Sequence, residues 1–334
     1  MDLRSWLIVG WLAGSGLAGG AAEVSPGDSG NDAAPSAPAP HPVLAQGSFT
    51  NSYQLKVAEH WLLNLPDQQR FDASALLFLP DGTLYTVNDK SAGLYRIDRH
   101  TTGTADLTRD PRWFTPLQLT NLSVGKLAHW DLEGLALDPQ GRIYFCEEQN
   151  RWVIRADPAR GTMERLEIDW APVRKWFSAD RNASWEGIAV GNDGRLYLAN
   201  ERSIGRIIVV DLASLRVIDD FAVAPLGRVS RDFMYSDLAW FGDDLWVLCR
   251  QSRRVVRVNP QTHRVLADFD YTNIEISSEF GYITPLPYGQ FEGLAVDAGN
   301  IWLVIDNNGS PRVRHKPDTR PTLFRCRRPD LAPE

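Results

Sequence analysis

The sequence predicts an all-β protein, a five-bladed β-propeller of four-stranded antiparallel blades whose ring is closed by an N-terminal strand. Three observations predict this fold: one sequence unit occurs five times, each copy has a β-hairpin pattern, and a further strand pattern precedes the first copy. The copies begin 50 to 59 residues apart, at Ala73, Leu132, Trp185, Tyr235 and Phe291. This period is that of propeller blades and is too long for leucine-rich or ankyrin repeats.

Each unit has an apolar strand, a tight turn and a returning strand rich in β-branched and aromatic residues. In the second unit these are residues 135–137, the turn 138–141 (DPQG) and residues 142–146. A third and a fourth strand are expected to complete each blade. The last unit has a weak outer half at 322–326, and we expect residues 54–63 to complete that blade. A sixth, degenerate blade in residues 98–130 is the main alternative.

The N-terminal region has the composition of an export signal followed by a linker. Residues 1–22 combine one positive charge, a short apolar run and small residues suited to signal peptidase. That run is shorter than a bilayer span and contains glycines, so a transmembrane anchor is not favoured. Residues 23–50 are rich in Pro, Ala and Ser and are expected to be disordered. We expect a periplasmic or secreted protein, without a stable membrane anchor after cleavage, whose propeller spans 51–330.

Charge and composition exclude several classes of function. The formal net charge of the 334-residue chain is −7, so no basic field for nucleic acid is expected. Beyond residues 1–22, the sequence has no G-x-S-x-G, H-E-x-x-H or C-x-x-C motif, no phosphate-binding glycine loop and no dinucleotide fingerprint. The three cysteines, Cys146, Cys249 and Cys326, are not expected to form a disulfide framework. The sequence is compatible with a small-molecule or ester substrate.

Acidic residues recur at two equivalent positions of the unit. The first position begins the inner strand, and the second ends the next strand, so both are expected at one end of the channel. The first set is Ser74, Glu133, Glu186, Ser236 and Glu292, and the second set is Asp89, Glu148, Glu201, Arg250 and Asp306. Seven converging carboxylates repel one another and suit a hard cation such as Ca²⁺. We predict that these seven acids are metal ligands and that they form a Ca²⁺ site. The alternative is that each glutamate only caps its own blade.

Two further residues are candidates for catalysis. His129, four residues before Glu133, could serve as an acid or base, or simply form hydrogen bonds within its loop. Arg250 could hold an anionic substrate group or pair with the neighbouring acids.

The repeats resemble a known family. Residues 131–148 (DLEGLALDPQGRIYFCEE), 184–201 (SWEGIAVGNDGRLYLANE) and 291–308 (FEGLAVDAGNIWLVIDNN) are similar to the repeats of the phytase-like family with esterase-like activity. They also resemble the SdiA-regulated proteins, which are exported five-bladed propellers with a bound calcium. The resemblance implies that Glu133, Glu186 and Glu292 occupy the acidic channel positions. Propeller phytases differ in having six blades and a denser acidic cleft.

Two functions from different classes follow. One is a metal-dependent hydrolase of phosphoric or carboxylic esters, with its site at the acidic channel mouth. The other is a non-catalytic extracytoplasmic binding or scaffold protein in which calcium rigidifies the channel. Fold alone does not decide between them.

Overall fold

The computed structural model describes residues 51–65, 69–89, 91–123, 130–181, 183–201, 205–225, 234–285 and 289–331. The predicted signal and linker segments, 1–22 and 23–50, lie outside these residues. Within the described part, no helix has the length and apolar character that a membrane span requires.

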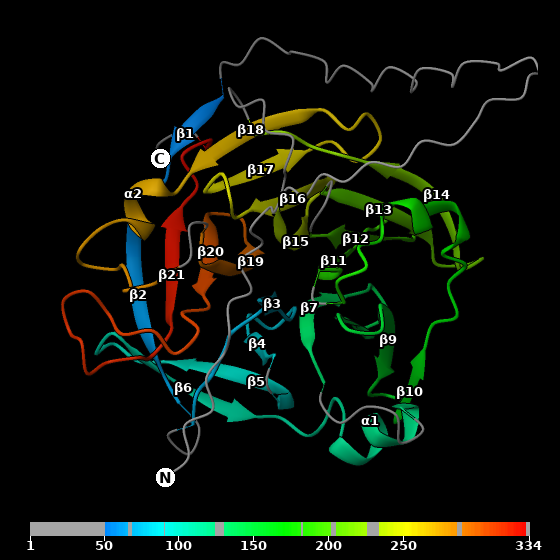
Figure 1. Cartoon of the computed structure of the whole chain (residues 1–334), viewed down its shortest axis with the longest axis horizontal. Helices are drawn as coiled ribbons and strands as arrows, with labels where there is room; N and C mark the ends of the chain where they lie inside the picture. Colours follow the sequence, from blue (N-terminus) through cyan, green and yellow to red (C-terminus); the bar gives the residue numbers. More distant parts are fainter. Residues whose placement is uncertain are drawn as a thin grey trace, which may run out of the picture. The chain divides into compact units, whose positions relative to one another are not determined.

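The described strands form four mostly antiparallel sheets, and strands that follow one another within a sequence unit are neighbours in their sheet (Figure 1). One sheet contains β7 (Leu132–Leu137), β8 (Ile143–Glu147), β9 (Trp152–Asp157) and β10 (Thr162–Arg165). The next contains β11 (Trp185–Val190), β12 (Arg195–Asn200), β13 (Arg206–Asp211) and β14 (Arg216–Phe221). A third contains β15 (Tyr235–Phe241), β16 (Asp244–Cys249), β17 (Arg254–Val258) and β18 (Val265–Asp270), with β1 (Ser52–Gln54) added parallel to β18.

The fourth sheet has eight strands because it joins the first and last sequence units. Its two halves are β3 (Leu77–Phe78), β4 (Leu84–Asn88), β5 (Ser91–Arg99) and β6 (Thr104–Arg109), and β19 (Phe291–Val296), β20 (Asn300–Ile305), β21 (Thr322–Arg327) and β2 (Val57–Asn64). The expected pairing of the N-terminal strand is confirmed, since β2 lies antiparallel to β21. β2 also pairs with β6 in parallel, which the sequence did not predict.

The first strand of each unit lies at one end of its sheet order, and these strands contact one another in succession. β7 contacts β3 and β11, β15 contacts β11 and β19, and β19 contacts β3. Figure 1 shows them gathered around a common centre. These five strands are called the inner strands below.

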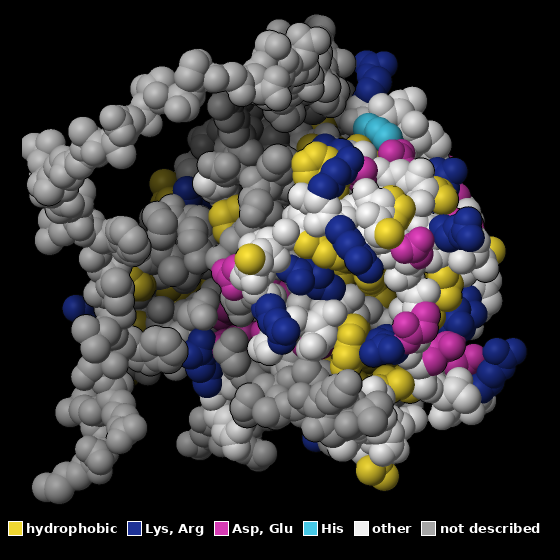
Figure 2. Space-filling view, turned by 45° about the vertical axis from the view of Figure 1, so that its right-hand side comes forward, with side chains coloured by type: hydrophobic (Ala, Val, Ile, Leu, Met, Phe, Trp, Pro, Cys, Tyr) yellow, Lys and Arg dark blue, Asp and Glu magenta, His cyan; other side chains and the backbone are white. Residues whose placement is uncertain are grey.

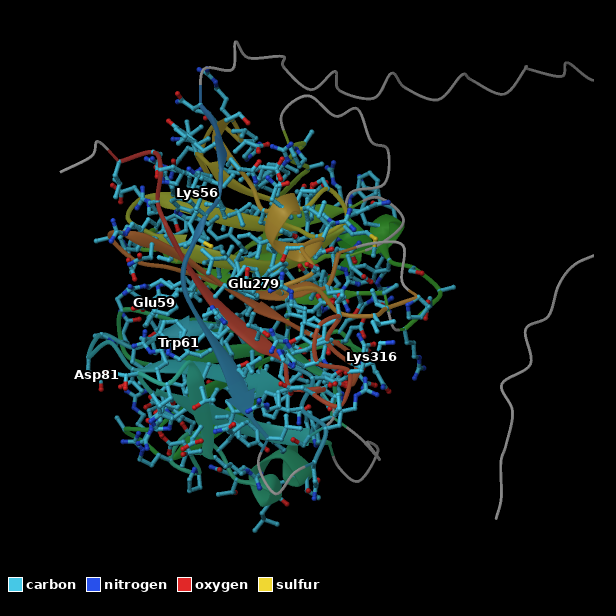
Figure 3. All side chains as sticks on the ribbon, turned by 90° about the vertical axis from the view of Figure 1, so that its left-hand side faces the viewer. Lys56, Glu59, Trp61, Asp81, Glu279 and Lys316 are labelled. Atoms are coloured by element: carbon cyan, nitrogen blue, oxygen red, sulfur yellow. The ribbon has the colours of Figure 1, made fainter. Side chains whose placement is uncertain are left out.

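Connections differ at the two ends of the inner strands. At one end the β-hairpin turns are short, with Gly141 and Gly194 at equivalent positive-φ positions (+78° and +77°). At the other end the longer connections contain α1 (Pro116–Ser123), η2 (Ala171–Trp176) and α2 (Thr272–Glu275). In Figure 3, Asp81 of the β3–β4 turn and Lys316 of the β20–β21 connection lie on opposite sides. On the face shown in Figure 2, basic and acidic side chains are interspersed.

The core consists of apolar side chains packed between neighbouring sheets. One cluster unites Tyr144 and Val153 of one sheet with Trp185, Ile188 and Leu196 of the next. All three cysteines are buried and free. The core therefore comes from sheet-on-sheet contact, which explains why nearly every inner and second strand is apolar.

Close contact between inner strands depends on the glycine that follows the glutamate. A Cβ on Gly187 would lie 2.6 Å from the Cα of Asp237 on the neighbouring strand. The backbone of the neighbouring strand cannot move aside as a flexible side chain can. We therefore expect Gly187→Ala to reduce the free energy of unfolding by about 1–3 kcal/mol, as overpacking does elsewhere.

Urea denaturation checks this expectation, with Gly299→Ala as the matched control. A Cβ on Gly299 would have its nearest contact at 3.9 Å, and no positive φ is required there. The control should stay within about 0.5 kcal/mol of the parent protein. Equal stability of the two variants would contradict the close-packing argument.

Candidate metal centre at the acidic end of the inner strands

Five equivalent backbone hydrogen bonds bring the two predicted positions together. In each unit, the residue ending the second strand donates its N–H to the carbonyl of the residue two before the predicted inner-strand position. The pairs are Asp89 to Asp72 (3.2 Å), Glu148 to Asp131 (3.0 Å), Glu201 to Ser184 (2.9 Å), Arg250 to Met234 (3.1 Å) and Asp306 to Gln290 (3.0 Å). All seven predicted acids therefore lie at one end of the inner strands, the end with the longer connections.

A β-bulge orients the inner-strand acids. The ladder register shifts between Leu132 and Gly134, between Trp185 and Gly187, and between Phe291 and Gly293. In each case the glutamate is the residue without a partner in the strand ladder. Because a bulged residue leaves the regular alternation, it can be aimed where the ladder would not place it. Glu133, Glu186 and Glu292 have exposed fractions of 9%, 7% and 9%.

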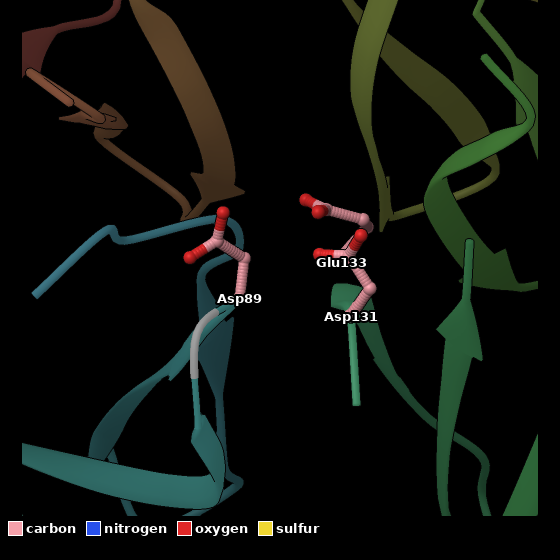
Figure 4. Close-up of side chains that lie close together, drawn as sticks. All are labelled: Asp89, Asp131 and Glu133. Carbon is pink, nitrogen blue, oxygen red and sulfur yellow. The ribbon is translucent and has the colours of Figure 1, made fainter. Parts of the chain in front are cut away.

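One group of carboxylates consists of Asp89, Asp131 and Glu133. One oxygen of each lies within 4.8 Å of the others. Asp89 faces Asp131 and Glu133 across the space between two units (Figure 4). Burial, followed by the charge of Glu186, raises the pKa of Glu133 well above its usual value. Among the described residues, neither Asp131 nor Glu133 has a basic ion-pair partner. This group, the Asp89 group, thus concentrates negative charge in a buried place.

A second group consists of Glu148, Glu186 and Glu201. One carboxylate oxygen of each lies within 4.8 Å of the others. Glu148 accepts a hydrogen bond from the Ser184 N–H at 3.2 Å. Burial, then the charge of Asp131, raises the pKa of Glu148 to about 8. The pKa of Glu186 is also raised, first by burial and then by the charge of Glu201, and a hydrogen bond to Glu148 adds to it. Both shifts favour the protonated carboxyl group over the charged carboxylate.

Arg250 compensates the charges on the far side of this group. Its guanidinium forms ion pairs with Glu201 and with Glu292, and all three side chains are buried. The second oxygen of Glu292 is buried and has no hydrogen-bond partner in the described part of the chain. Of the two roles open for Arg250, the structure shows pairing with neighbouring acids.

Asp306 belongs to a third cluster, beside the Asp89 group. Its carboxylate accepts hydrogen bonds from the N–H and the side-chain amide of Asn308, at 2.7 and 2.8 Å. Burial, then the charge of Asp72, raises the pKa of Asp306 to about 7. Arg70 pairs with Asp72 at 2.6 Å, so this cluster has its own counter-charge.

Sequence reasoning missed Asp72 and Asp131. Both occupy the position two residues before the inner-strand start, which is Ser184, Met234 and Gln290 in the other units. The five backbone hydrogen bonds make this position part of the site. The repeated spacing could have identified it, but it lies ahead of the strand pattern. Ser236 donates to the carbonyl of Phe291 at 2.9 Å, which links two inner strands. His129 lies outside the described residues.

The raised pKa values predict an unusual pH dependence for the metal-free protein. Glu148 and Asp306 hold protons to about pH 8 and 7 when folded, but only to about pH 4 when unfolded. The folded state binds more protons between those limits. Stability is therefore present at low pH and lost as pH rises, by up to about 1.4 kcal/mol per pH unit for each group.

We expect dialysed, chelator-treated protein to melt at a lower temperature at pH 8 than at pH 5.5. Glu148→Gln should flatten this slope, because the amide does not titrate. Glu164→Gln, on the exposed edge strand β10, should not alter it. A melting temperature that rises over this interval in the parent protein would contradict the assignment.

These features define a class, a β-propeller with buried carboxylates gathered at one end of its inner strands. A model of the Phytase-like family, described as esterase-like activity of phytase, matches residues 71–309. The chain belongs to this family.

A solved structure agrees on the fold. Glutaminyl cyclase from Myxococcus xanthus, a β-propeller, superimposes with a TM-score of 0.54 at 14% identity, covering 83% of this chain and 97% of that one. Aldose sugar dehydrogenase from Streptomyces coelicolor gives a TM-score of 0.45 at 13% identity, covering 82% and 97%. A virginiamycin B lyase from Staphylococcus aureus gives 0.40 at 14%, covering 76% and 66%. A search of curated proteins found no significant match.

Proposed function

We propose that the protein is an exported, five-bladed propeller that binds calcium at its acidic end and hydrolyses phosphoric or carboxylic esters there. The blade count is supported by the closed succession of inner strands β3, β7, β11, β15 and β19. In this assignment β2 supplies the outermost strand of the blade that contains β19, β20 and β21.

The observation that carries the cation proposal is the Asp89 group. Asp131 and Glu133 are buried and lack a basic partner within the described residues, whereas Asp72, Glu201 and Glu292 each have an arginine. Uncompensated buried carboxylates are strongly destabilising. A set of carboxylate oxygens suits Ca²⁺, which takes six to eight oxygen ligands. Asp89, Asp131 and Glu133 would hold the ion, and the other predicted acids would complete or surround its shell.

The neighbouring Glu148–Glu186 pair supports a hydrolytic role. A bound calcium ion would polarise a phosphoryl or acyl oxygen and lower the pKa of a coordinated water. Glu148, whose pKa is about 8, holds a proton at neutral pH, as a general acid requires, and the raised pKa of Glu186 favours its protonated form as well. Ser184 fixes Glu148 through its backbone N–H. On one side of this pair, the positive charge of Arg250 compensates the negative charge of Glu201.

Hydrolysis of nitrophenyl phosphate and nitrophenyl acetate, with and without calcium, tests this function. We expect calcium-dependent turnover of at least one ester. Loss of an acid–base group typically costs a factor of about 10²–10⁴, so Glu148→Gln should reduce kcat accordingly. Glu164→Gln is the control, because its carboxylate pairs with Arg155 on outer strands. Turnover that survives both chelation and Glu148→Gln would refute the proposed site.

A non-catalytic role as a calcium-stabilised binding or scaffold protein is the second candidate. Arg250 favours this candidate, because its guanidinium already forms ion pairs with two glutamates and is not available to bind an anionic substrate. Under this alternative, calcium raises the melting temperature but neither ester is hydrolysed.

The proposed location outside the cytoplasm rests on the sequence pattern of residues 1–22. N-terminal sequencing of the protein recovered from a periplasmic or culture fraction tests it. Cleavage near residue 22 is expected, and recovery of uncleaved protein from the cytoplasm alone would reject it.

A further inference from the structure

The end of the inner strands opposite the acidic site contains a cavity. Its volume is about 670 Å³, within the roughly 300–1,000 Å³ typical of small-molecule sites. Every inner strand or the turn after it contributes to its wall, through Leu77, Leu137, Val190, Trp240 and Val296. The cavity therefore lies on the common centre of the sheets and is not a crevice between two loops.

The wall of this cavity is mainly apolar and is not completely covered by the protein. Leu77, Leu137 and Trp240 are only partly buried although they belong to inner strands. Phe78 and Phe241 extend the apolar wall and are also partly buried. Apolar surface left in water forgoes the free energy of its burial. An apolar ligand that filled the cavity would recover this contribution.

The charged residues around the cavity are not equivalent. Asp138 accepts hydrogen bonds from Arg142 and Tyr144, and Asp297 from Asn300 and Trp302, so both carboxylates are used within their own hairpins. Arg99 differs, since among the described residues it has no ion-pair partner.

Tryptophan rings hold Arg99 in place. Its guanidinium carbon lies 4.7 Å from the ring centroid of Trp302 and 5.7 Å from that of Trp61. Glu59 of β2 forms an ion pair with Arg325 of β21 at 2.8 Å, so this acid near Arg99 already has a partner. A positive charge fixed by cation–π contacts at the edge of an apolar cavity is complementary to an anion attached to an apolar body.

The cavity is separate from the acidic site. The acids lie where the inner strands begin, and the cavity lies where they end. Between them is Asp237, which is completely buried and accepts hydrogen bonds from Leu238 of its own strand (2.8 Å) and Leu294 of β19 (2.7 Å). In Figure 3, Trp61 lies toward the side of Asp81, away from Lys316.

From the cavity and the position of Arg99 we infer a second ligand site, which binds an aliphatic monocarboxylate with its chain in the cavity and its carboxylate on Arg99. This site is independent of the proposed hydrolase function.

Calorimetric titration with decanoate and with decanol tests the inference on the full chain. We expect saturable binding of one decanoate per protein. Arg99→Gln should weaken decanoate binding about tenfold, as expected for loss of one charge-assisted contact, and leave decanol binding unchanged. Leu137→Trp, which fills the cavity, should weaken both. Arg155→Gln removes an arginine from the corresponding strand β9 of the next sheet and should change neither.

Three results would overturn the inference: no saturable binding to the parent protein, unchanged decanoate binding in Arg99→Gln, or unchanged binding of both ligands in a folded Leu137→Trp variant. If Leu137→Trp does not fold, Arg99→Gln still decides the matter, because that side chain is exposed and its removal leaves the core intact.

Discussion

Calcium is expected to raise the melting temperature of the purified protein, and Glu133→Gln is expected to remove most of that rise. A ligand that binds only the folded state at one hundred times its Kd adds about 2.7 kcal/mol to the free energy of unfolding. For a domain of this size that corresponds to a shift of several degrees. The effect is large because the Asp89 group consists of buried carboxylates whose mutual repulsion the ion would relieve.

The same substitution should act in the opposite direction without calcium. Glu133 faces the charges of Glu186, Asp89 and Asp131. An amide at this position removes that repulsion, so at pH 8 the metal-free variant should be at least as stable as the metal-free parent. Glu164→Gln, whose carboxylate is exposed, should retain the full calcium shift. A calcium shift of equal size in Glu133→Gln and the parent would show that the ion, if bound, lies elsewhere.

Much of the fold could be predicted because the repeat is explicit. The turn residues and the alternation of apolar strands are local. They place the end of β7 at Leu137 and both ends of β8 within one residue, although β7 begins three residues earlier than predicted. Even the long-range pairing of β2 with β21 was accessible, because the last unit lacked an outer strand. The parallel pairing of β2 with β6 was not accessible, since no local pattern links those segments.

The site was predictable as a set but not as an arrangement. Equivalent positions in a repeat must converge, which is why the seven acids share one end of the inner strands. Their division into separate groups depends on which units are neighbours and on where arginines fall. Arg70 lies before the first repeat and Arg250 replaces an acid in the fourth. The sequence left the role of Arg250 open, and only the structure shows that it lies between Glu201 and Glu292.

Arg250→Met is expected to cause the largest loss of stability of any single substitution in the acidic region. Arg250 is 6% exposed, and its partners Glu201 and Glu292 are 0% and 9% exposed. Removing one partner of a buried ion pair costs about 3–5 kcal/mol, because the remaining charge stays buried without compensation. Here two carboxylates lose their counter-charge together. Urea denaturation of metal-free protein at pH 7 measures the loss.

Removing the two carboxylates that lack a counter-charge in Arg250→Met should restore the lost stability. Adding Glu201→Gln and Glu292→Gln to Arg250→Met makes all three side chains uncharged, and most of the lost free energy of unfolding should return. Arg155→Met breaks a pair whose glutamate is 56% exposed, so its cost should stay below about 1 kcal/mol. If the triple variant were no more stable than Arg250→Met, the arginine would act through packing, and charge compensation at this end of the inner strands would have to be attributed to another group.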